Sequence, residues 1–292
     1  MKELVVISGK GGTGKTSIAA ALALLAEKPV VADCDVDAAD LHLLLAPEVK
    51  ERHEFISGHE AVIRAADCTG CGKCAELCRF DAIEKSVVAD GRTVYAVDPI
   101  ACEGCGVCVR FCPAHAIDLP DSRCGEWMVS DTRVGPMVHA RLAAAAENSG
   151  KLVSLVRKEA RRIAEEQGAD LLIVDGPPGI GCPVIASLTG ASWVLVVTEP
   201  TVSGEHDMIR VLELARHFGI PAAVCVNKYD INLGTAVRIE SAARDRGAFI
   251  TGRIPYDPAV TVAQLKGKSV VETGGPAAEA IQQMWRVLCR ML

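Results

Sequence analysis

Short apolar runs alternate with longer helical patterns at both ends of the chain. Runs rich in Val, Leu and Ile occupy residues 4–8, 29–33, 170–175, 193–198 and 222–227. Apolar runs without polar alternation are typical of strands that are buried on both faces, and their alternation with helices favours a parallel sheet. The pattern therefore predicts an α/β fold, with a mostly parallel sheet and helices on both of its faces.

A segment of different character interrupts this alternation between about residues 60 and 119. It is rich in cysteine, and its two halves repeat, since CRFDAI at Cys78–Ile83 is echoed by CPAHAI at Cys112–Ile117. Such a duplication predicts a small α+β domain inserted into a larger one. We expect residues 1–59 and 120–292 to form the two parts of the larger domain, and residues 60–119 to form the insert.

Eight of the 13 cysteines fall in two runs with the same spacing inside this insert. The spacing, two, two and three residues between successive cysteines, resembles that of bacterial ferredoxins that bind two [4Fe-4S] clusters, and the second run ends in Cys-Pro. In those proteins the fourth cysteine of each run binds the other cluster. The resemblance thus predicts cluster 1 on Cys68, Cys71, Cys74 and Cys112, and cluster 2 on Cys78, Cys102, Cys105 and Cys108.

One position departs from that pattern, because Arg79 stands where the first run would carry proline. Zinc and disulfides are the alternative interpretations of the cysteines. Zinc sites commonly pair two separated Cys-x-x-Cys knuckles rather than repeat a run of four, and disulfides are rare in proteins of the cytosol. Two [4Fe-4S] clusters are therefore the preferred prediction.

A phosphate-binding motif follows the first apolar run. Residues 9–16, GKGGTGKT, satisfy the pattern G-x-x-x-x-G-K-[ST] between a predicted strand and a predicted helix. In this pattern the backbone of the loop cradles phosphates, the lysine neutralises them and the hydroxyl reaches Mg²⁺. The expected nucleotide-binding residues of the loop are Gly11, Gly12, Thr13, Gly14, Lys15, Thr16 and Ser17, with Thr16 also on Mg²⁺.

The early lysine of the motif, Lys10, narrows the family. A loop of the form KGGxGK[ST] resembles the deviant P-loop ATPases of the MinD/ParA superfamily, which includes the nitrogenase iron protein and the Mrp-type iron–sulfur carriers. In these proteins the early lysine reaches the nucleotide of a partner subunit, so hydrolysis needs a closed homodimer. The resemblance covers almost the whole chain and implies that Lys10 and Lys15 act in ATP hydrolysis.

The same resemblance identifies residues 29–45 as the first switch and residues 170–183 as a Walker B strand that runs into the second switch, and it assigns roles to acidic residues in both. Asp35 is expected to orient the attacking water, a step that assists phosphoryl transfer without covalent chemistry. Asp33 would lie nearer the Mg²⁺ shell, and Asp175 would hold a water on Mg²⁺.

Three residues are expected at the base of the nucleotide. Asn227 would contact the base, and Pro255 and Asp257 would lie in the loop that closes over adenine. The string Asn227-Lys228-Tyr229-Asp230 also resembles a guanine-specificity motif, although the deviant loop favours ATP. Cys182, directly after the second switch, is a candidate interface thiol, with burial as a small apolar residue as the alternative.

Composition narrows the classes of function further. The 292 residues, of which 50% are hydrophobic, permit one full α/β domain and one small one. A net charge of -6 argues against a protein that binds nucleic acid through a basic surface. No apolar run approaches the roughly 20 residues that span a bilayer, and the first residues read as a strand rather than a signal peptide. We therefore expect a cytoplasmic protein.

The C-terminal helix has one apolar face, formed by Ala277, Ile281, Met284, Trp285, Leu288 and Met291. MinD proteins bind membranes through a tail of this kind. Packing against the sheet explains the same pattern, and the few basic residues favour packing.

Three functions fit these motifs. The first is an ATP-gated redox protein, in which the nucleotide state of a homodimer alters electron exchange between the clusters and a partner protein. The second is an ATPase that assembles or transfers iron–sulfur or other metallocofactors, but the chain lacks the C-terminal Cys-x-x-Cys pair of Mrp-type carriers. The third is a MinD-like positioning ATPase with redox-sensing clusters. We prefer the first, with ATP, Mg²⁺ and two [4Fe-4S] clusters as cofactors.

Overall fold

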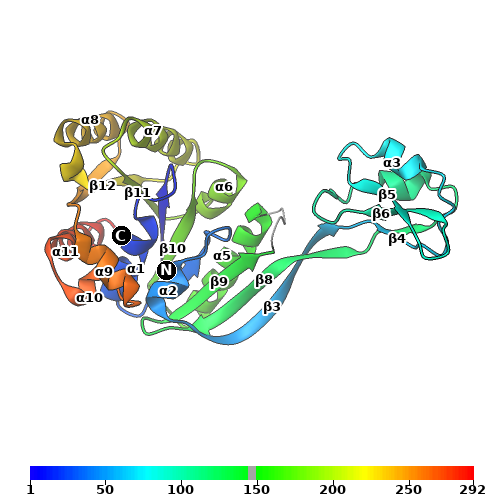
Figure 1. The fold of residues 1–292 in the computed structure, drawn as a ribbon. Coiled ribbons are helices and arrows are strands. Elements are labelled where there is room, and N and C mark those ends of the chain that lie inside the picture. The colour runs from blue at the N-terminus through cyan, green and yellow to red at the C-terminus, as the bar shows by residue number, and fades with distance from the viewer. Residues whose placement is uncertain (144–148) are drawn as a thin grey trace. The chain divides into compact units, whose positions relative to one another are not determined.

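The computed structural model describes residues 1–143 and 149–292 and divides the chain into two units (Figure 1). Unit 1 comprises Met1–His53, Trp127–Arg141 and Ser149–Leu292, and unit 2 comprises Glu54–Glu126 and Leu142–Asn148. Residues 144–148, which the sequence analysis assigned to the larger domain, lie outside the described residues. The segment Glu54–Glu126 of unit 2 is longer than the predicted insert of residues 60–119 and extends beyond it on both sides.

A nine-stranded sheet is the largest in the described part of the chain, with the order β13-β12-β11-β1-β10-β2-β9-β8-β3. Its strands are β1 (Lys2–Ser8), β2 (Val30–Asp33), β3 (Glu48–His59), β8 (Asp121–Asp131), β9 (Pro136–Leu142), β10 (Leu171–Pro178), β11 (Trp193–Thr198), β12 (Ala222–Asn227) and β13 (Phe249–Ile254). All neighbours from β13 to β9 pair in parallel. This confirms the predicted α/β fold with a mostly parallel sheet.

Helices cover both faces of this sheet in unit 1 (Figure 1). Successive strand residues point to opposite faces, so Leu4 and Val6 of β1 pack in one core with α1 and α11, whereas Val5 and Ile7 are buried on the face of α6 and α7. The helices of unit 1 are α1 (Lys15–Leu25), α2 (Leu41–Leu45), α5 (Ser149–Glu166), α6 (Cys182–Leu188), α7 (Val202–His217), α8 (Leu233–Arg244), α9 (Pro258–Leu265), α10 (Val270–Thr273) and α11 (Pro276–Leu288), with a 3₁₀ turn at Tyr229–Ile231.

The apolar face of the C-terminal helix α11 packs inside unit 1. Ile281, Met284 and Leu288 are buried in the core that also contains Leu22 of α1, and Trp285 packs against it. Packing against the sheet therefore accounts for the apolar face that the sequence analysis found. Among residues 1–143 and 149–292, no helix combines the length and the apolar character needed to cross a membrane.

Unit 2 repeats one small motif twice. Its elements are β4 (Val62–Ile63), α3 (Lys73–Leu77), β5 (Ile83–Val87), β6 (Thr93–Val97), α4 (Val107–Phe111) and β7 (Ile117–Asp118). The five-residue helices α3 and α4 both begin after a glycine with positive φ, Gly72 at 78° and Gly106 at 72°. Strand β5 pairs antiparallel with β6, and β4 pairs antiparallel with β7. The hairpin β5–β6 follows α3, whereas β4 and β7 pair from opposite ends of the segment that contains the two cysteine runs.

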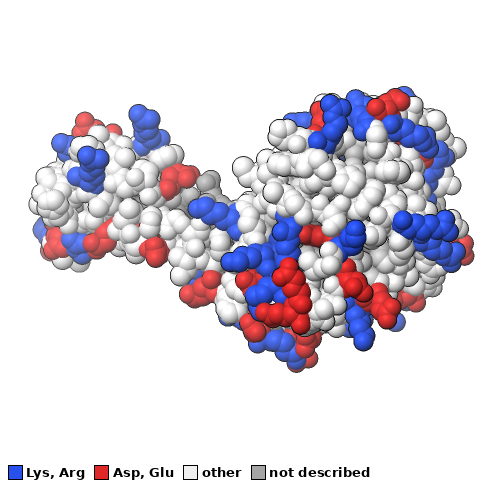
Figure 2. Space-filling model, turned by 180° about the vertical axis from the view of Figure 1, so that it is seen from behind, with Lys and Arg blue, Asp and Glu red and all other residues white. Residues whose placement is uncertain are grey.

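A buried ion pair joins the first strand of unit 1 to helix α5. The Glu3 carboxylate accepts hydrogen bonds from Nε of Arg157 and from Nε of Arg161, both at 2.7 Å. The side chains of Glu3 and Arg157 are only 4% and 5% exposed, so water solvates neither charge and each depends on the other for compensation. Most other ion pairs lie at the surface, where basic and acidic side chains are interspersed on the face that Figure 2 shows.

We expect Glu3→Ala to lower the free energy of unfolding of unit 1 by about 3 kcal/mol, because it leaves the Arg157 guanidinium buried without its counter-charge. Urea denaturation measures the change. The matched control is Glu166→Ala, which removes the carboxylate of the exposed Arg162–Glu166 ion pair on α5. It should change the free energy of unfolding by less than about 1 kcal/mol. Equal losses in the two variants would show that the buried pair does not stabilise the unit.

Candidate functional site

The phosphate-binding loop lies between β1, which ends at Ser8, and α1, which begins at Lys15. Gly14 precedes the helix with a φ of 87°, a conformation that side chains rarely adopt, and a side chain there would collide with the Asn227 amide. The Asn227 Nδ2 donates a hydrogen bond to the carbonyl of Thr13 at 2.8 Å. The end of β12 therefore fixes the shape of the loop.

A cavity of about 430 Å³ opens over this loop. The predicted nucleotide-binding residues Gly11, Gly12, Thr13, Gly14, Lys15, Thr16, Ser17, Asn227, Pro255 and Asp257 line it, as does Asp35, which was predicted to orient the attacking water. The cavity thus brings together the loop, the first switch, the end of β12 and the turn after β13, which lie far apart in the sequence.

Two of the predicted base-contact residues also have structural partners. Asn227 holds the loop through its amide nitrogen, while its Oδ1 accepts a hydrogen bond from the backbone N–H of Lys228 at 3.0 Å. Asp257 caps α9 by accepting from the Ala259 N–H at 2.9 Å, and it also accepts from the Ala277 N–H. Both side chains therefore shape the cavity as well as line it.

Lys15 is the centre of a buried charged group. Its Nζ lies 2.7 Å from Oδ1 of Asp175, 3.3 Å from Oδ2 of Asp35 and 3.2 Å from Oγ1 of Thr16. Burial alone would lower the pKa of Lys15, but the carboxylates of Asp175 and Asp35 outweigh it and raise the pKa. The ammonium thus stays charged among the carboxylates of two strand ends.

Asp33 lies deeper than Asp35. Its Oδ1 accepts the backbone N–H of Asp35 at 3.2 Å, its Oδ2 accepts that of Leu41 at 3.3 Å, and it is fully buried. Burial, and then the charge of Asp175, raise the pKa of Asp33 well above its usual value; burial also raises the pKa of Asp35, where Lys15 opposes it. Two of the three carboxyl groups, those of Asp35 and Asp175, contact the Lys15 ammonium, and Asp33 pairs in register with Asp175 on the neighbouring strand.

Neither Asp33 nor Asp175 is among the described residues that line the cavity. Asp175 is connected to the cavity by its ion pair with Lys15, which does line it. Oδ2 of Asp175 is buried and has no hydrogen-bond partner among the described residues. Across the described parts of the chain, no group of three or more His, Cys, Asp or Glu side chains converges to hold a metal ion. Mg²⁺ commonly keeps several waters and takes only one or two protein carboxylates beside phosphates.

Lys10 points to its own chain beside the cavity. Its Nζ donates to Oγ1 of Thr201 and Oγ of Ser203, both at 3.3 Å, and lies 3.6 Å from Oε2 of Glu199. Lys10 is not among the described residues that line the nucleotide cavity. The contacts with Glu199, Thr201 and Ser203 therefore hold the Lys10 side chain outside the lining of the nucleotide cavity.

Sequence reasoning did not predict the contacts of two residues at this site, Lys228 and Gln264. Lys228 donates to Oε1 of Glu199 at 2.5 Å and to the carbonyl of Gly12 at 3.3 Å, and Gln264 donates to Oγ of Ser17 at 2.7 Å. The signal for Lys228 was its place in the Asn-Lys-x-Asp string. Gln264 carried no signal, because it lies on a helix far along the chain.

Cys182 is exposed at the first residue of α6 in unit 1. A Cβ on Gly150 would lie 3.4 Å from the Cys182 Cβ, so the start of α5 passes close to it. The alternative of a buried apolar residue does not describe this cysteine, whereas Cys34 and Cys225 are buried. All 13 cysteines lie among the described residues and are free.

Unit 2 has two small cavities at its cysteine runs. Cavity 1 is lined by Cys68, Cys71, Cys74 and Cys112, and cavity 2 by Cys78, Cys102, Cys105 and Cys108. The last cysteine of each run thus lies at the cavity of the other run, in the same grouping as the two ligand sets expected from the ferredoxin spacing. Burial raises the pKa of the Cys74 and Cys108 thiols.

Comparisons with known proteins place the chain. Residues 4–270 match the family described as CobQ/CobB/MinD/ParA nucleotide binding domain. The uncharacterized protein MJ0578 of Methanocaldococcus jannaschii is 34% identical over 233 residues, 79% of each chain, and an uncharacterized ATP-binding protein of that organism, MJ0547, is 22% identical over 96% of this chain and 85% of its own.

A solved structure of MinD complexed with Mg-ADP, from Pyrococcus horikoshii, has the same fold at 16% identity, with a TM-score of 0.59 over 99% of this chain and 96% of that one. The loop, its cavity and the family match agree with one another. The chain therefore belongs to the CobQ/CobB/MinD/ParA nucleotide-binding family and is a P-loop ATPase of the MinD/ParA type.

Proposed function

We propose that this ATPase couples a nucleotide-driven switch in a homodimer to electron transfer through two [4Fe-4S] clusters. The observation that carries the proposal is the grouping of the cysteines, since each cavity of unit 2 is lined by three cysteines of one run and the last cysteine of the other. An ATPase alone has no use for such an arrangement.

The donor sets suit this cofactor. Each iron of a [4Fe-4S] cluster takes one thiolate, so the four free cysteines that line each cavity match one cluster in number. They bind different irons, so they need not converge on one point, and no described group of three or more does so. Clusters bound there would supply one-electron redox chemistry, while the chain's own thiolates would anchor them and its backbone would exclude water.

The sparse core of unit 2 also supports the proposal. Its buried apolar residues, in the part that is described, are Phe55, Ala61, Ala82, Ile83, Val94, Ala116, Ile117 and Cys124. So small a core seldom stabilises a domain of this size without disulfides or metal. With every cysteine free, bound clusters would give unit 2 the internal links that its side chains do not provide.

At the nucleotide site, Lys15 would exchange its contact with Asp175 for the β- and γ-phosphates. Thr16, Asp33 and Asp175 would then face Mg²⁺ or its waters, and the unpartnered Oδ2 of Asp175 is suited to accept from such a water. Asp35, next to Lys15, would orient the attacking water. The MinD of P. horikoshii, which was solved with Mg-ADP, supports this use of the shared fold.

Covalent connections favour coupling between the two chemistries. Asp35 is followed by α2 and then by β3, which begins in unit 1 and ends in unit 2, and β8 carries the chain back. A movement of the first switch therefore has a short path along the chain to the cluster-binding residues. We propose the divisions 1–59, 60–119 and 120–292 as the functional parts of the chain, with an unidentified redox protein as the partner.

For hydrolysis, we expect Lys15→Ala to abolish tight ATP binding, because the phosphate charge is no longer neutralised. Lys10→Ala and Asp35→Ala should keep binding but lose turnover by about 10³-fold. Calorimetric titration with ATP and phosphate release measure the two effects. Lys50→Ala, an exposed lysine of β3, is the matched control and should leave both unchanged. Normal turnover in Lys10→Ala would contradict a role across the dimer.

For cluster content, we expect about eight irons per chain after anaerobic purification, because two four-iron clusters each need four thiolates. Cys112→Ser should damage the cluster of the first run and Cys78→Ser that of the second, as iron analysis and absorption spectra would show. Cys289→Ser, an exposed cysteine of unit 1, should keep the full content. Zinc in place of iron, or four irons that reconstitution does not raise, would contradict the proposal.

For coupling, we expect ATP to shift the potential of at least one cluster. A shift of about 59 mV for one electron corresponds to a tenfold change in an equilibrium constant, so reduction must change ATP affinity tenfold as well. Redox titrations with and without ATP, and ATP titrations of both redox states, measure the two sides of this relation. If the cluster potentials do not change with ATP, and ATP stimulates transfer of a cluster to an apo-acceptor, the protein is instead a cofactor-assembly ATPase.

A further inference from the structure

The two cysteine cavities differ in the polar groups that line them. The residues that line cavity 1 include Thr69 and Tyr95, whose side chains carry hydroxyls, and those that line cavity 2 include the acidic residue Glu103. Among the described residues, no acidic side chain lines cavity 1 and no hydroxyl side chain lines cavity 2. The two sites are therefore chemically unequal, although their cysteines are spaced identically.

Tyr95 stands over the loop between two cysteines of cavity 1. Its Oη lies 2.7 Å from the position that a Cβ on Gly72 would occupy, so the phenol fills the space of a missing side chain between Cys71 and Cys74. At the matching position of the second run, Gly106, the nearest atom is a methyl of Leu119 at 3.2 Å. A hydrogen-bond donor thus faces one loop and an apolar group faces the other.

Glu103 also makes the two cavities unequal, because it adds an acidic side chain at cavity 2 that the described lining of cavity 1 does not have. It follows the first cysteine of the second run, where the first run has Thr69, and it is an exposed residue in the lining of cavity 2. A carboxylate next to a cluster opposes the added negative charge of a reduced cluster, whereas a hydrogen bond donated to cluster sulfur stabilises it.

We propose that Tyr95 raises the reduction potential at cavity 1 and Glu103 lowers it at cavity 2, so that a single electron resides at cavity 1. The inference rests on the proposed function, because it needs both clusters. A low-potential one-electron donor, such as a reduced viologen, loses one electron and the cluster at cavity 1 gains it. No bond forms or breaks, and the next electron goes to cavity 2. Tyr95 and Glu103 are positioning residues of this order.

The test is an anaerobic redox titration of the full chain, followed by electron paramagnetic resonance, in Tyr95→Phe and Glu103→Gln variants. At a fixed solution potential, Tyr95→Phe should lower the reduced-to-oxidised ratio of the higher-potential cluster about tenfold, or about 59 mV. Glu103→Gln should raise that of the lower-potential cluster. Each variant should leave the other cluster unchanged.

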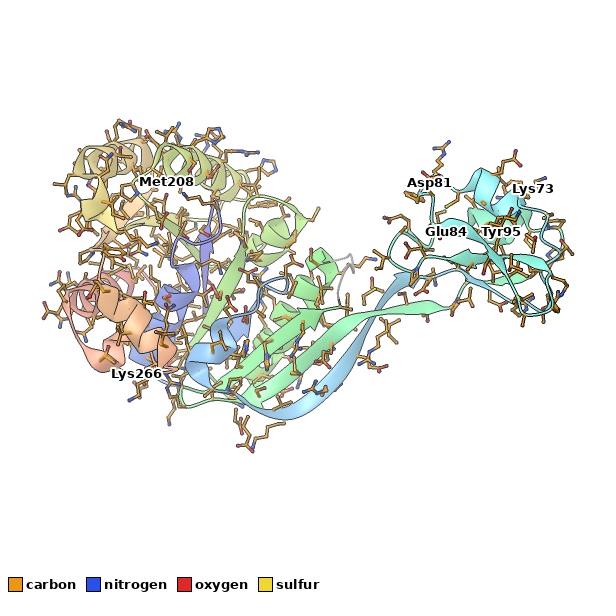
Figure 3. All side chains as sticks on the ribbon, viewed as in Figure 1. Lys73, Asp81, Glu84, Tyr95, Met208 and Lys266 are labelled. Carbon is orange, nitrogen blue, oxygen red and sulfur yellow. The ribbon has the colours of Figure 1, made fainter. Side chains whose placement is uncertain are left out.

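Matched controls lie on the hairpin β5–β6, where Figure 3 labels Glu84 and Tyr95. Glu84→Gln removes an exposed carboxylate of unit 2, and Ser86→Ala removes an exposed hydroxyl from the paired strand β5; neither residue is among those that line the cavities. Both variants should keep the wild-type potentials.

Iron content separates the possible failures. Variants that hold about eight irons but show no shift, the same shift in both clusters or the reverse order would overturn the inference and leave the proposed function in place. A wild-type chain without iron–sulfur clusters would overturn the proposed function itself. If Tyr95→Phe loses iron, Tyr95→Trp, which retains an N–H donor, should keep the wild-type potential, and Glu103→Gln then decides the order.

Discussion

One ammonium group, Nζ of Lys15, holds together strand ends that the chain brings from distant positions. Lys15 is the first residue of α1. One carboxylate partner, Asp35, follows β2, and the other, Asp175, ends the apolar run of β10 and lies 160 residues from Lys15 in the sequence. The parallel register sets Asp175 beside Asp33 and Val6. Because the carboxyl ends of parallel strands share one edge, the phosphate loop and the acidic groups meet there.

Unit 2 depends on a different constraint. Its helices α3 and α4 are short, its strands pair in twos, and few of its apolar side chains are buried. Under the proposed function, the clusters bound by its cysteines would organise this unit where side-chain packing is sparse. The chain thus combines a unit with a large apolar core and a unit with few buried apolar side chains.

The sequence predicted the features whose determinants are local. The strand, glycine loop and helix around Lys15 are contiguous, and the spacing of the cysteines is readable without a structure. Strand β3 was not predicted, because most of its residues are charged or exposed and give no apolar pattern. The contact of Lys228 with Glu199 and the place of Tyr95 over Gly72 depend on how distant segments meet, which no single run of residues encodes.

The entry and exit strands of unit 2, β3 and β8, are neighbours in the sheet. A flexible insertion between two neighbouring strands costs only about 0.6 kcal/mol of closure entropy for each doubling of its length. Replacing a tight turn with the segment 54–126 would therefore cost a few kcal/mol, about four doublings, if that segment were unfolded. Once the segment folds as its own unit, most of that cost disappears. An ancestral ATPase could thus acquire the cysteine-rich domain at one hairpin without changing the parallel strands that hold its nucleotide site.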